Sequence, residues 1–160
     1  MKKENLGPLT AVSFPVYVNV LAGRCAELQS IVDQWGVPRF WARSPGFETL
    51  FFIILQQQIS LPVARVIYRR VKESLGGVSA RRVLETGPER LHVLGLTKQK
   101  SRYCCELATA VKEKRFSVEG LKKVDDSTAI SLLCAQLGIG PWSSAIYLMS
   151  ALKRLDVWPP

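Results

Sequence analysis

A glycine-flanked turn near the C-terminus carries the residue types and spacing that point most clearly to a chemistry. Residues 137–143 read Leu-Gly-Ile-Gly-Pro-Trp-Ser and lie between two apolar helical patterns. Gly138 and Gly140 allow a very tight turn and let an anion approach the main chain closely. Ile139 between them is expected to point back into the core. The pattern predicts two antiparallel helices that are joined by a short, anion-accessible turn.

The helix after this turn begins with groups that attract negative charge. Pro141 suits the first helical position, where the N–H that it lacks would have no intrahelical partner. Trp142 and Ser143 then present main-chain N–H groups at a helix N-terminus, which favours a phosphate, and the Ser143 hydroxyl adds a donor. The pattern therefore predicts that this turn binds the sugar-phosphate backbone of one nucleic-acid strand. The alternative is an ordinary packing unit of two helices, because Gly-x-Gly alone is a weak signal.

The composition favours a polyanionic partner and argues against a metal centre. The 160 residues include 22 Lys and Arg against 13 Asp and Glu, which gives a net charge of +9. Such a surplus favours nucleic acid, although a merely soluble basic protein has a similar balance. The four cysteines form no Cys-x-x-Cys pair, and His92 is the single histidine. We therefore expect reduced thiols and no bound metal.

The N-terminal part of the chain differs in character from the rest. Residues 10–21 are rich in Val, Phe and Tyr, which favours a strand or an extended arm over residues 1–23. Pro and Asn residues interrupt the weak resemblance of this stretch to a signal peptide, so we expect no export. The apolar run 51–55 is far shorter than the ~20 residues of a membrane span. We expect a protein of the cytoplasm or nucleus without a membrane partner.

From Cys25 onward, the hydrophobic periodicity predicts helix after helix. Residues 46–59 are nearly all apolar and should form a central buried helix. Thr97 and Asp126 are suited to be N-caps of later helices, and the last helix should cover residues 141–153. The predicted fold is all-α, with one helical domain at residues 24–160.

Four segments of this chain resemble, in their order and spacing, the helix-hairpin-helix DNA glycosylases of base-excision repair. The resemblance is greatest to the 3-methyladenine DNA glycosylase II branch, which removes alkylated bases. Residues 47–60 are similar to the family's helix that ends in Gln-Gln-x-Ser, and residues 94–100 to its Gly-Leu-Ser-x-x-Lys segment. Residues 137–143 are similar to its hairpin, and residues 155–159 to the segment before its catalytic Asp. The four segments span roughly residues 25–160.

The resemblance implies how DNA would be held. An enzyme that acts on a stacked base must flip it out and fill the gap, and Gln58 falls at the filling position. Trp142 would line an aromatic pocket for an electron-poor alkylated base, whereas we expect Tyr147 and Trp158 to pack in the core. The residues that this comparison assigns to DNA binding are Gln57, Gln58, Ser60, Lys100, Gly138, Gly140, Trp142 and Ser143.

The resemblance also implies the type of reaction. Strand-cleaving members carry a Schiff-base Lys where this chain has Trp142, and iron–sulfur members carry a four-Cys cluster that is absent here. Both differences indicate simple hydrolysis of the N-glycosidic bond. The family's catalytic Asp comes a few residues beyond the segment that contains Asp156, and the sequence ends at Pro160 first. We therefore expect a fold that is incomplete on its C-terminal side and a chain that binds DNA without turnover, with Asp156 as a weak substitute.

These observations lead to one main interpretation and two alternatives. The main one is hydrolytic removal of alkylated purines, such as 3-methyladenine, from duplex DNA by a monomer. No organic cofactor is implied, although hairpins of this kind often hold a monovalent cation on their carbonyl oxygens. The first alternative is a non-catalytic helix-hairpin-helix module that binds DNA. The second is a helical packing domain with no role on DNA, whose DNA affinity would not weaken as salt rises.

Overall fold

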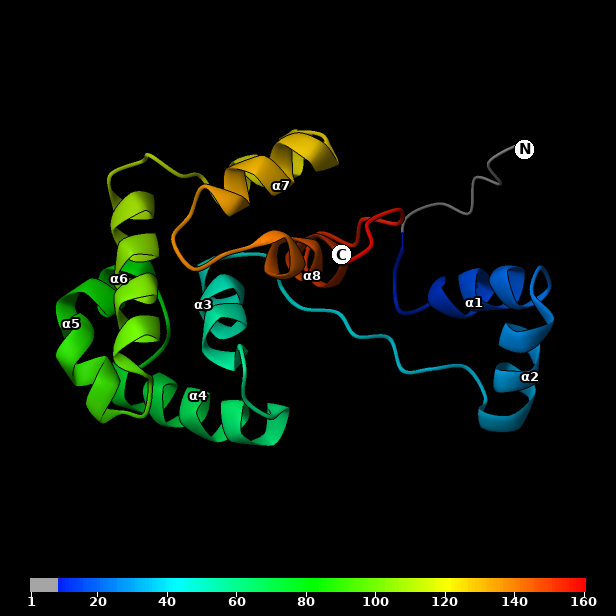
Figure 1. Cartoon of the computed structure of the whole chain (residues 1–160), viewed down its shortest axis with the longest axis horizontal. Helices are drawn as coiled ribbons and strands as arrows, with labels where there is room; N and C mark the ends of the chain where they lie inside the picture. The colour runs from blue at the N-terminus through cyan, green and yellow to red at the C-terminus, as the bar shows by residue number, and fades with distance from the viewer. Residues whose placement is uncertain (1–8) are drawn as a thin grey trace.

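The computed structural model describes residues 9–160, and this part of the chain is helical with no strand, which confirms the all-α prediction (Figure 1). A long extended segment, residues 36–46, separates the first two helices from the others. In chain order the elements are α1 (Phe14–Ala22), α2 (Ala26–Trp35), α3 (Phe47–Gln56), α4 (Leu61–Leu75), α5 (Ala80–Val93), α6 (Lys98–Lys112), the 3₁₀ helix η1 (Glu119–Lys123), α7 (Asp126–Cys134) and α8 (Pro141–Ser150).

The expectation of an extended N-terminal arm is wrong for α1. Pro15 lies in the first turn of this helix, where its fixed φ and missing N–H are tolerated. Helix α1 instead forms a helical hairpin with α2, because the strand preference of Val and Phe is only a weak bias. Phe14 of α1 also contacts Phe40 of the extended segment, with ring centroids 5.0 Å apart. The predicted boundary at residues 23 and 24 falls in the turn between α1 and α2, and residues 1–8 lie outside the described part.

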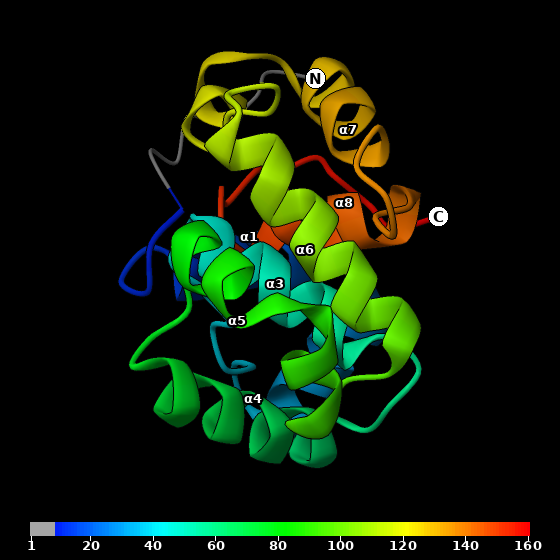
Figure 2. The same ribbon diagram turned by 90° about the vertical axis from the view of Figure 1, so that its left-hand side faces the viewer.

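Helix α3 occupies the centre of the main body, as its apolar sequence predicted. Leu50, Phe51 and Ile54 are fully buried, and the helix packs against α4, α6 and α8. Figure 2 shows α6 crossing in front of α3, with α4 on one side and α7 on the other. The helix ends at Gln56 rather than at residue 59, because Gln57 already has an extended ψ of 134°. Residues 57–60, which are polar except for Ile59, therefore form a loop instead of a last helical turn.

Helix α6 begins beside this loop and packs against α5. Helix α5 packs along α6 and is kinked at Gly87, which precedes Pro88 and has a φ of 74°. Thr97 caps α6 as predicted, since its side-chain oxygen accepts a hydrogen bond of 3.2 Å from the backbone N–H of Lys100. The first turn of α6 is thus held in place close to the end of α3.

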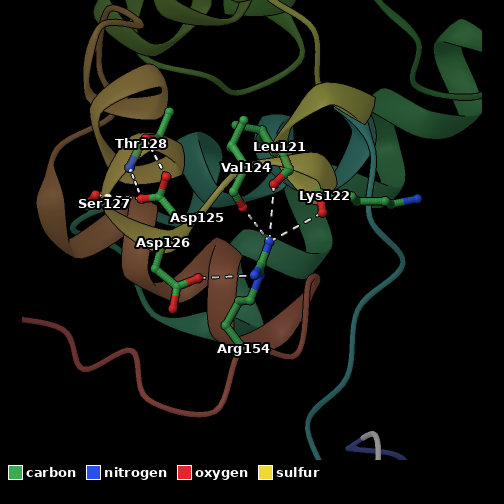
Figure 3. A network of polar contacts seen from close by, with 8 residues as sticks. All are labelled: Leu121, Lys122, Val124, Asp125, Asp126, Ser127, Thr128 and Arg154. Carbon is green, nitrogen blue, oxygen red and sulfur yellow. Dashed lines mark hydrogen bonds and ion pairs between the residues drawn. The ribbon is translucent and has the colours of Figure 1, made fainter.

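The N-cap of α7 is Asp125 and not Asp126, which corrects the prediction by one residue. Asp125 Oδ1 accepts a hydrogen bond of 2.9 Å from the backbone N–H of Thr128, and the Ser127 and Thr128 hydroxyls also donate to this carboxylate (Figure 3). Asp126 is the first helical residue and instead pairs with Arg154 at 3.4 Å. Asp125 and Asp126 can both cap a helix, and Asp125 is the cap because the Ser127 hydroxyl, the Thr128 hydroxyl and the Thr128 N–H all donate to it.

Arg154 fastens the segment after α8 to the start of α7. Its Nη2 donates to three main-chain carbonyl oxygens around the end of η1, namely those of Leu121, Lys122 and Val124, at 3.5, 3.4 and 2.9 Å (Figure 3). These carbonyls and the Asp126 carboxylate occupy the guanidinium. Arg154 therefore stabilises the position of α7 relative to the segment after α8, and its charge is taken up by these contacts.

Replacing Asp125 with Asn should make the protein less sensitive to acid. The hydrogen bonds from Ser127 and Thr128 hold the pKa of the Asp125 carboxyl well below its usual range. Because the folded-state pKa is the lower one, the stabilisation is present above the unfolded pKa, near 4, and is lost as the pH falls. Asn keeps the cap without titrating. The loss of melting temperature between pH 7 and pH 3 should therefore be smaller for Asp125→Asn than for the wild type, and an equal loss would contradict this explanation.

Two negative observations concern residues 9–160. No helix in this range is both long and apolar enough to cross a membrane. No group of three or more His, Cys, Asp or Glu side chains in it is arranged to hold a metal ion. Cys104 is fully buried, which raises the pKa of its thiol, and all four cysteines are free.

Candidate nucleic-acid interface

The predicted hairpin connects α7 to α8 by a tight turn, and its two glycines have different roles. Gly138 has a φ of +83°, and a Cβ atom there would lie 2.1 Å from a ring carbon of Tyr103. Gly140 has an ordinary φ of −100°, and a Cβ atom there would meet nothing within 4 Å. Gly138 is therefore required by the fold, whereas Gly140 keeps the surface of the turn open. Ile139 between them is 4% exposed and packs into the core, as predicted.

The outer side of the turn is open to solvent. Pro141 is exposed and Trp142 is 59% exposed at the start of α8. By helix geometry, the first-turn N–H groups have no carbonyl partner within the helix, and the macrodipole places partial positive charge there. An anion can therefore approach the backbone between Gly140 and Trp142.

Ser143 differs from this pattern. The residue is only 6% exposed, and its hydroxyl accepts a hydrogen bond of 3.1 Å from Gln57 Nε2. The same Gln57 nitrogen donates to the Gly138 carbonyl oxygen at 2.8 Å. The Ser143 hydroxyl, which was expected to face a phosphate, thus joins the hairpin to the loop after α3.

Lys100 holds this loop from the other side. Its Nζ donates to the carbonyl oxygens of Leu55 and Gln57 at 2.8 and 2.5 Å, so the ammonium closes the C-terminal end of α3. Partial burial lowers the pKa of Lys100. The side chain was predicted to contact DNA, and in the structure it orders the loop through which Gln58 would do so.

Gln58 is the exposed tip of the loop. It has a φ of +56°, in the left-handed region that residues other than glycine rarely adopt. Such strain persists only where the surroundings impose it, and here Gln57 and Lys100 fix the backbone on both sides. Ser60, two residues later, is the exposed N-cap residue of α4. The predicted position of Gln58 at the DNA is compatible with this geometry.

A groove of about 650 Å³ lies between the loop, the first turn of α6 and the start of α8. Trp142, Gln58 and Lys100 face it together, so three segments far apart in sequence meet at one site. Its walls combine apolar, aromatic and amide side chains, and no Asp or Glu of the described part lines it. The lining residues are Ile53, Gln56, Gln57, Gln58, Ile59, Leu61, Gln99, Lys100, Tyr103, Gly138, Trp142, Ser143 and Ile146.

The other residues considered from the sequence lie outside the groove. Tyr147 is fully buried and its hydroxyl accepts a hydrogen bond of 3.0 Å from the backbone N–H of Gly46, which confirms the expected core role. Trp158 is 87% exposed, so the expectation of core packing is wrong there. Asp156 is exposed and does not line the groove.

Sequence reasoning missed three contributors to the site. Tyr103 lies under Gly138 and its hydroxyl accepts a hydrogen bond of 2.7 Å from Gln99. Arg43, in the extended segment before α3, donates to Gln56 Oε1 at 3.2 Å. The sequence holds no signal for Arg43, because an isolated Arg before a helix is common. The spacing of Gln99 and Tyr103, four residues apart on one helical face, was the available signal for that pair.

The sequence of this chain is similar to that of a known DNA glycosylase. The chain is 36% identical over 124 residues to the DNA-3-methyladenine glycosylase of Saccharomyces cerevisiae, a match that covers 71% of this chain and 42% of the yeast protein. The chain thus spans about two fifths of the length of that relative. No model of a protein family matches the sequence.

Solved structures agree with the sequence comparison. The DNA-3-methyladenine glycosidase of Bacillus halodurans superposes with a TM-score of 0.74 at 27% identity, covering 90% of this chain and 66% of that one. The 3-methyladenine DNA glycosylase of Schizosaccharomyces pombe, solved in complex with abasic DNA, gives a TM-score of 0.73 at 20% identity, covering 91% of this chain and 72% of that one. The chain is therefore related in sequence to the 3-methyladenine DNA glycosylases, and it shares the fold of the helix-hairpin-helix DNA glycosylases.

Proposed function

We propose that this chain binds damaged duplex DNA and contributes to base-excision repair of alkylated purines such as 3-methyladenine. The observation that carries the proposal is the position of the open hairpin beside the Gln58 loop on one groove. A phosphate on the hairpin would bring the neighbouring nucleotides to Gln58 and Trp142. Gln58 could then occupy the gap in the stack, and the indole of Trp142 could stack on an alkylated base.

The first test is DNA binding itself. The 160-residue chain should bind a duplex with an abasic site, and the affinity should fall as salt rises because phosphate contacts release counterions. Gly140→Ala adds a methyl group where the structure is open, so the melting temperature should stay close to that of the wild type. Its DNA affinity should fall by on the order of tenfold, since one main-chain contact to a phosphate is obstructed. Fluorescence anisotropy between 50 and 200 mM salt measures both quantities.

Two results of that experiment would contradict the proposal. If the wild type shows no affinity at low salt, or an affinity that ignores salt, the chain is a packing domain without a DNA role. If Gly140→Ala binds DNA as tightly as the wild type, the anion-binding role of the turn is wrong.

We also propose that residues 1–160 by themselves bind DNA without releasing the base. The cleavage builds positive charge on the sugar, which a carboxylate stabilises, and the groove is lined by none from the described part. A non-catalytic DNA-binding module is the second candidate function for the same reason. The purified chain should release no 3-methyladenine from methylated DNA. Release that disappears in Asp156→Asn would instead assign the reaction to Asp156.

The remaining parts of the proposal concern surroundings and ligands. We propose a monomer that works in the compartment that holds DNA, with no organic cofactor. A monovalent cation could bind where residues 134–140 line an open pocket beside the hairpin, because main-chain carbonyl oxygens are its ordinary ligands. Replacing K⁺ with a bulky organic cation at constant ionic strength would weaken DNA binding if this cation is present.

A further inference from the structure

Two arginines lie next to residues that line the groove: Arg43 contacts Gln56, and Arg65 follows Leu61 by one helical turn. Arg43 comes from the extended segment before α3, and its main-chain N–H donates to the Ser150 carbonyl oxygen at 2.8 Å, at the end of α8. Its guanidinium donates to Gln56 Oε1 at 3.2 Å and lies 4.7 Å above the ring of Phe52. These contacts hold the half-buried cation in one orientation next to a side chain that lines the groove.

Arg65 reaches the same place from another element. It is exposed on α4, one turn after Leu61, so both residues lie on the same face of the helix. Burial lowers the pKa of Arg43, and the positive charge of Arg65 lowers it further. The fold thus brings two like charges together and partly removes one of them from water.

The described part of the chain provides no acid for this pair. Within residues 9–160, no carboxylate lies at ion-pair distance from Arg43 or Arg65. Glu48, on the same helix as Phe52, accepts hydrogen bonds from the Tyr68 hydroxyl and from Lys72, the latter at 2.8 Å. An external anion would therefore relieve the repulsion between the oriented guanidinium of Arg43 and the exposed one of Arg65.

We propose that Arg43 and Arg65 together bind a phosphodiester group of DNA, as a second phosphate position of the interface. The inference rests on the proposed function, because it assumes that the groove receives DNA. The hairpin offers main-chain N–H groups near Trp142, and the arginine pair offers two forked cations at Gln56 and Leu61. The Gln58 loop lines the same groove. Two phosphates of the bound strand would then be held at once.

The experiment measures how DNA affinity depends on salt for four variants of the 160-residue chain. They are Arg65→Gln, Arg43→Gln, the double variant Arg43→Gln/Arg65→Gln, and the control Lys112→Gln. Lys112 is exposed on α6, twelve residues and about 18 Å along the helix from Lys100. Each phosphate contact contributes about 0.9 to the slope of log affinity against log salt. The slope should fall by about 0.9 for the double variant, which loses the one phosphate contact, and by part of that amount for Arg65→Gln. It should keep the wild-type value for Lys112→Gln.

The possible outcomes separate this inference from the proposed function. If the wild type and Lys112→Gln bind DNA with one common slope and the arginine variants share it, the pair does not contact a phosphate, while DNA binding stands. If the wild type shows no salt-dependent binding, the proposed function fails and the inference fails with it. Arg43→Gln removes the contacts to Phe52 and Gln56, so a melting curve accompanies it. Should that variant unfold, Arg65→Gln decides alone, because its side chain is exposed.

Discussion

Gly138→Ala should lower the free energy of unfolding by about 2–4 kcal/mol and the melting temperature by roughly 5–15 °C. Two independent effects add at this position. The φ of +83° is unfavourable for any residue with a side chain, and the new methyl carbon would lie 2.1 Å from a ring carbon of Tyr103. Tyr103 cannot move freely, because its hydroxyl is bonded to Gln99 and its ring lies under the turn.

The same substitution should also weaken DNA binding in the protein that remains folded. The Gly138 carbonyl accepts a hydrogen bond from Gln57, so a shift of the turn moves the loop that carries Gln58. Thermal melts followed by circular dichroism, with anisotropy at a temperature below the transition, measure the two effects separately.

Gly140→Ala is the matched control, two residues away in the same turn. Its φ of −100° suits alanine, and the space around its Cβ is open. Its melting temperature should change by much less than that of Gly138→Ala. Equal melting temperatures for the two variants would show that Tyr103 and the backbone angle do not constrain the turn as described.

Lys100→Met should reduce stability by about 1–3 kcal/mol and weaken DNA binding, because two hydrogen bonds from an ammonium group to carbonyl oxygens are lost. The carbonyl oxygens of Leu55 and Gln57 would then lack this partner at the end of α3. The loop at Gln58, which already has an unfavourable backbone angle, would lose the contact that fixes it.

The salt dependence distinguishes two roles for Lys100. If the side chain acts by positioning the loop, DNA affinity falls while the slope against salt stays at the wild-type value. If it contacts a phosphate, as the sequence comparison implied, the slope falls by about 1. Lys98→Met is the control, since Lys98 is exposed in the first turn of the same helix and carries the same charge. A wild-type melting temperature for Lys100→Met would contradict the positioning role.

Local signals in the sequence were sufficient for most of the helices after residue 24 and for the turn itself, but not for α1. The Gly-Ile-Gly-Pro order determines a tight turn followed by a helix start, and Thr97 determines where α6 begins, because both depend on residues within one helical turn. The apolar run at residues 47–56 likewise could only form a buried helix. The predicted N-cap of α7 differs from the observed one by one residue, because Asp125 and Asp126 are equally suited by type. Three hydrogen-bond donors from neighbouring residues make Asp125 the cap.

The tertiary structure alone decided what the polar side chains of the site do. Gln57 and Gly138 are 81 residues apart, and Lys100 is 45 residues from Leu55, so no local pattern could indicate either contact. Arg43 meets Gln56 only because the extended segment returns along α3 and α8. The sequence by itself determined the helices after residue 24 and the tight glycine turn before the last helix, since helix periodicity and glycine angles are short-range properties. Which side chains line the groove and which hold the loops in place depended on packing between distant elements, because that packing sets their hydrogen-bond partners.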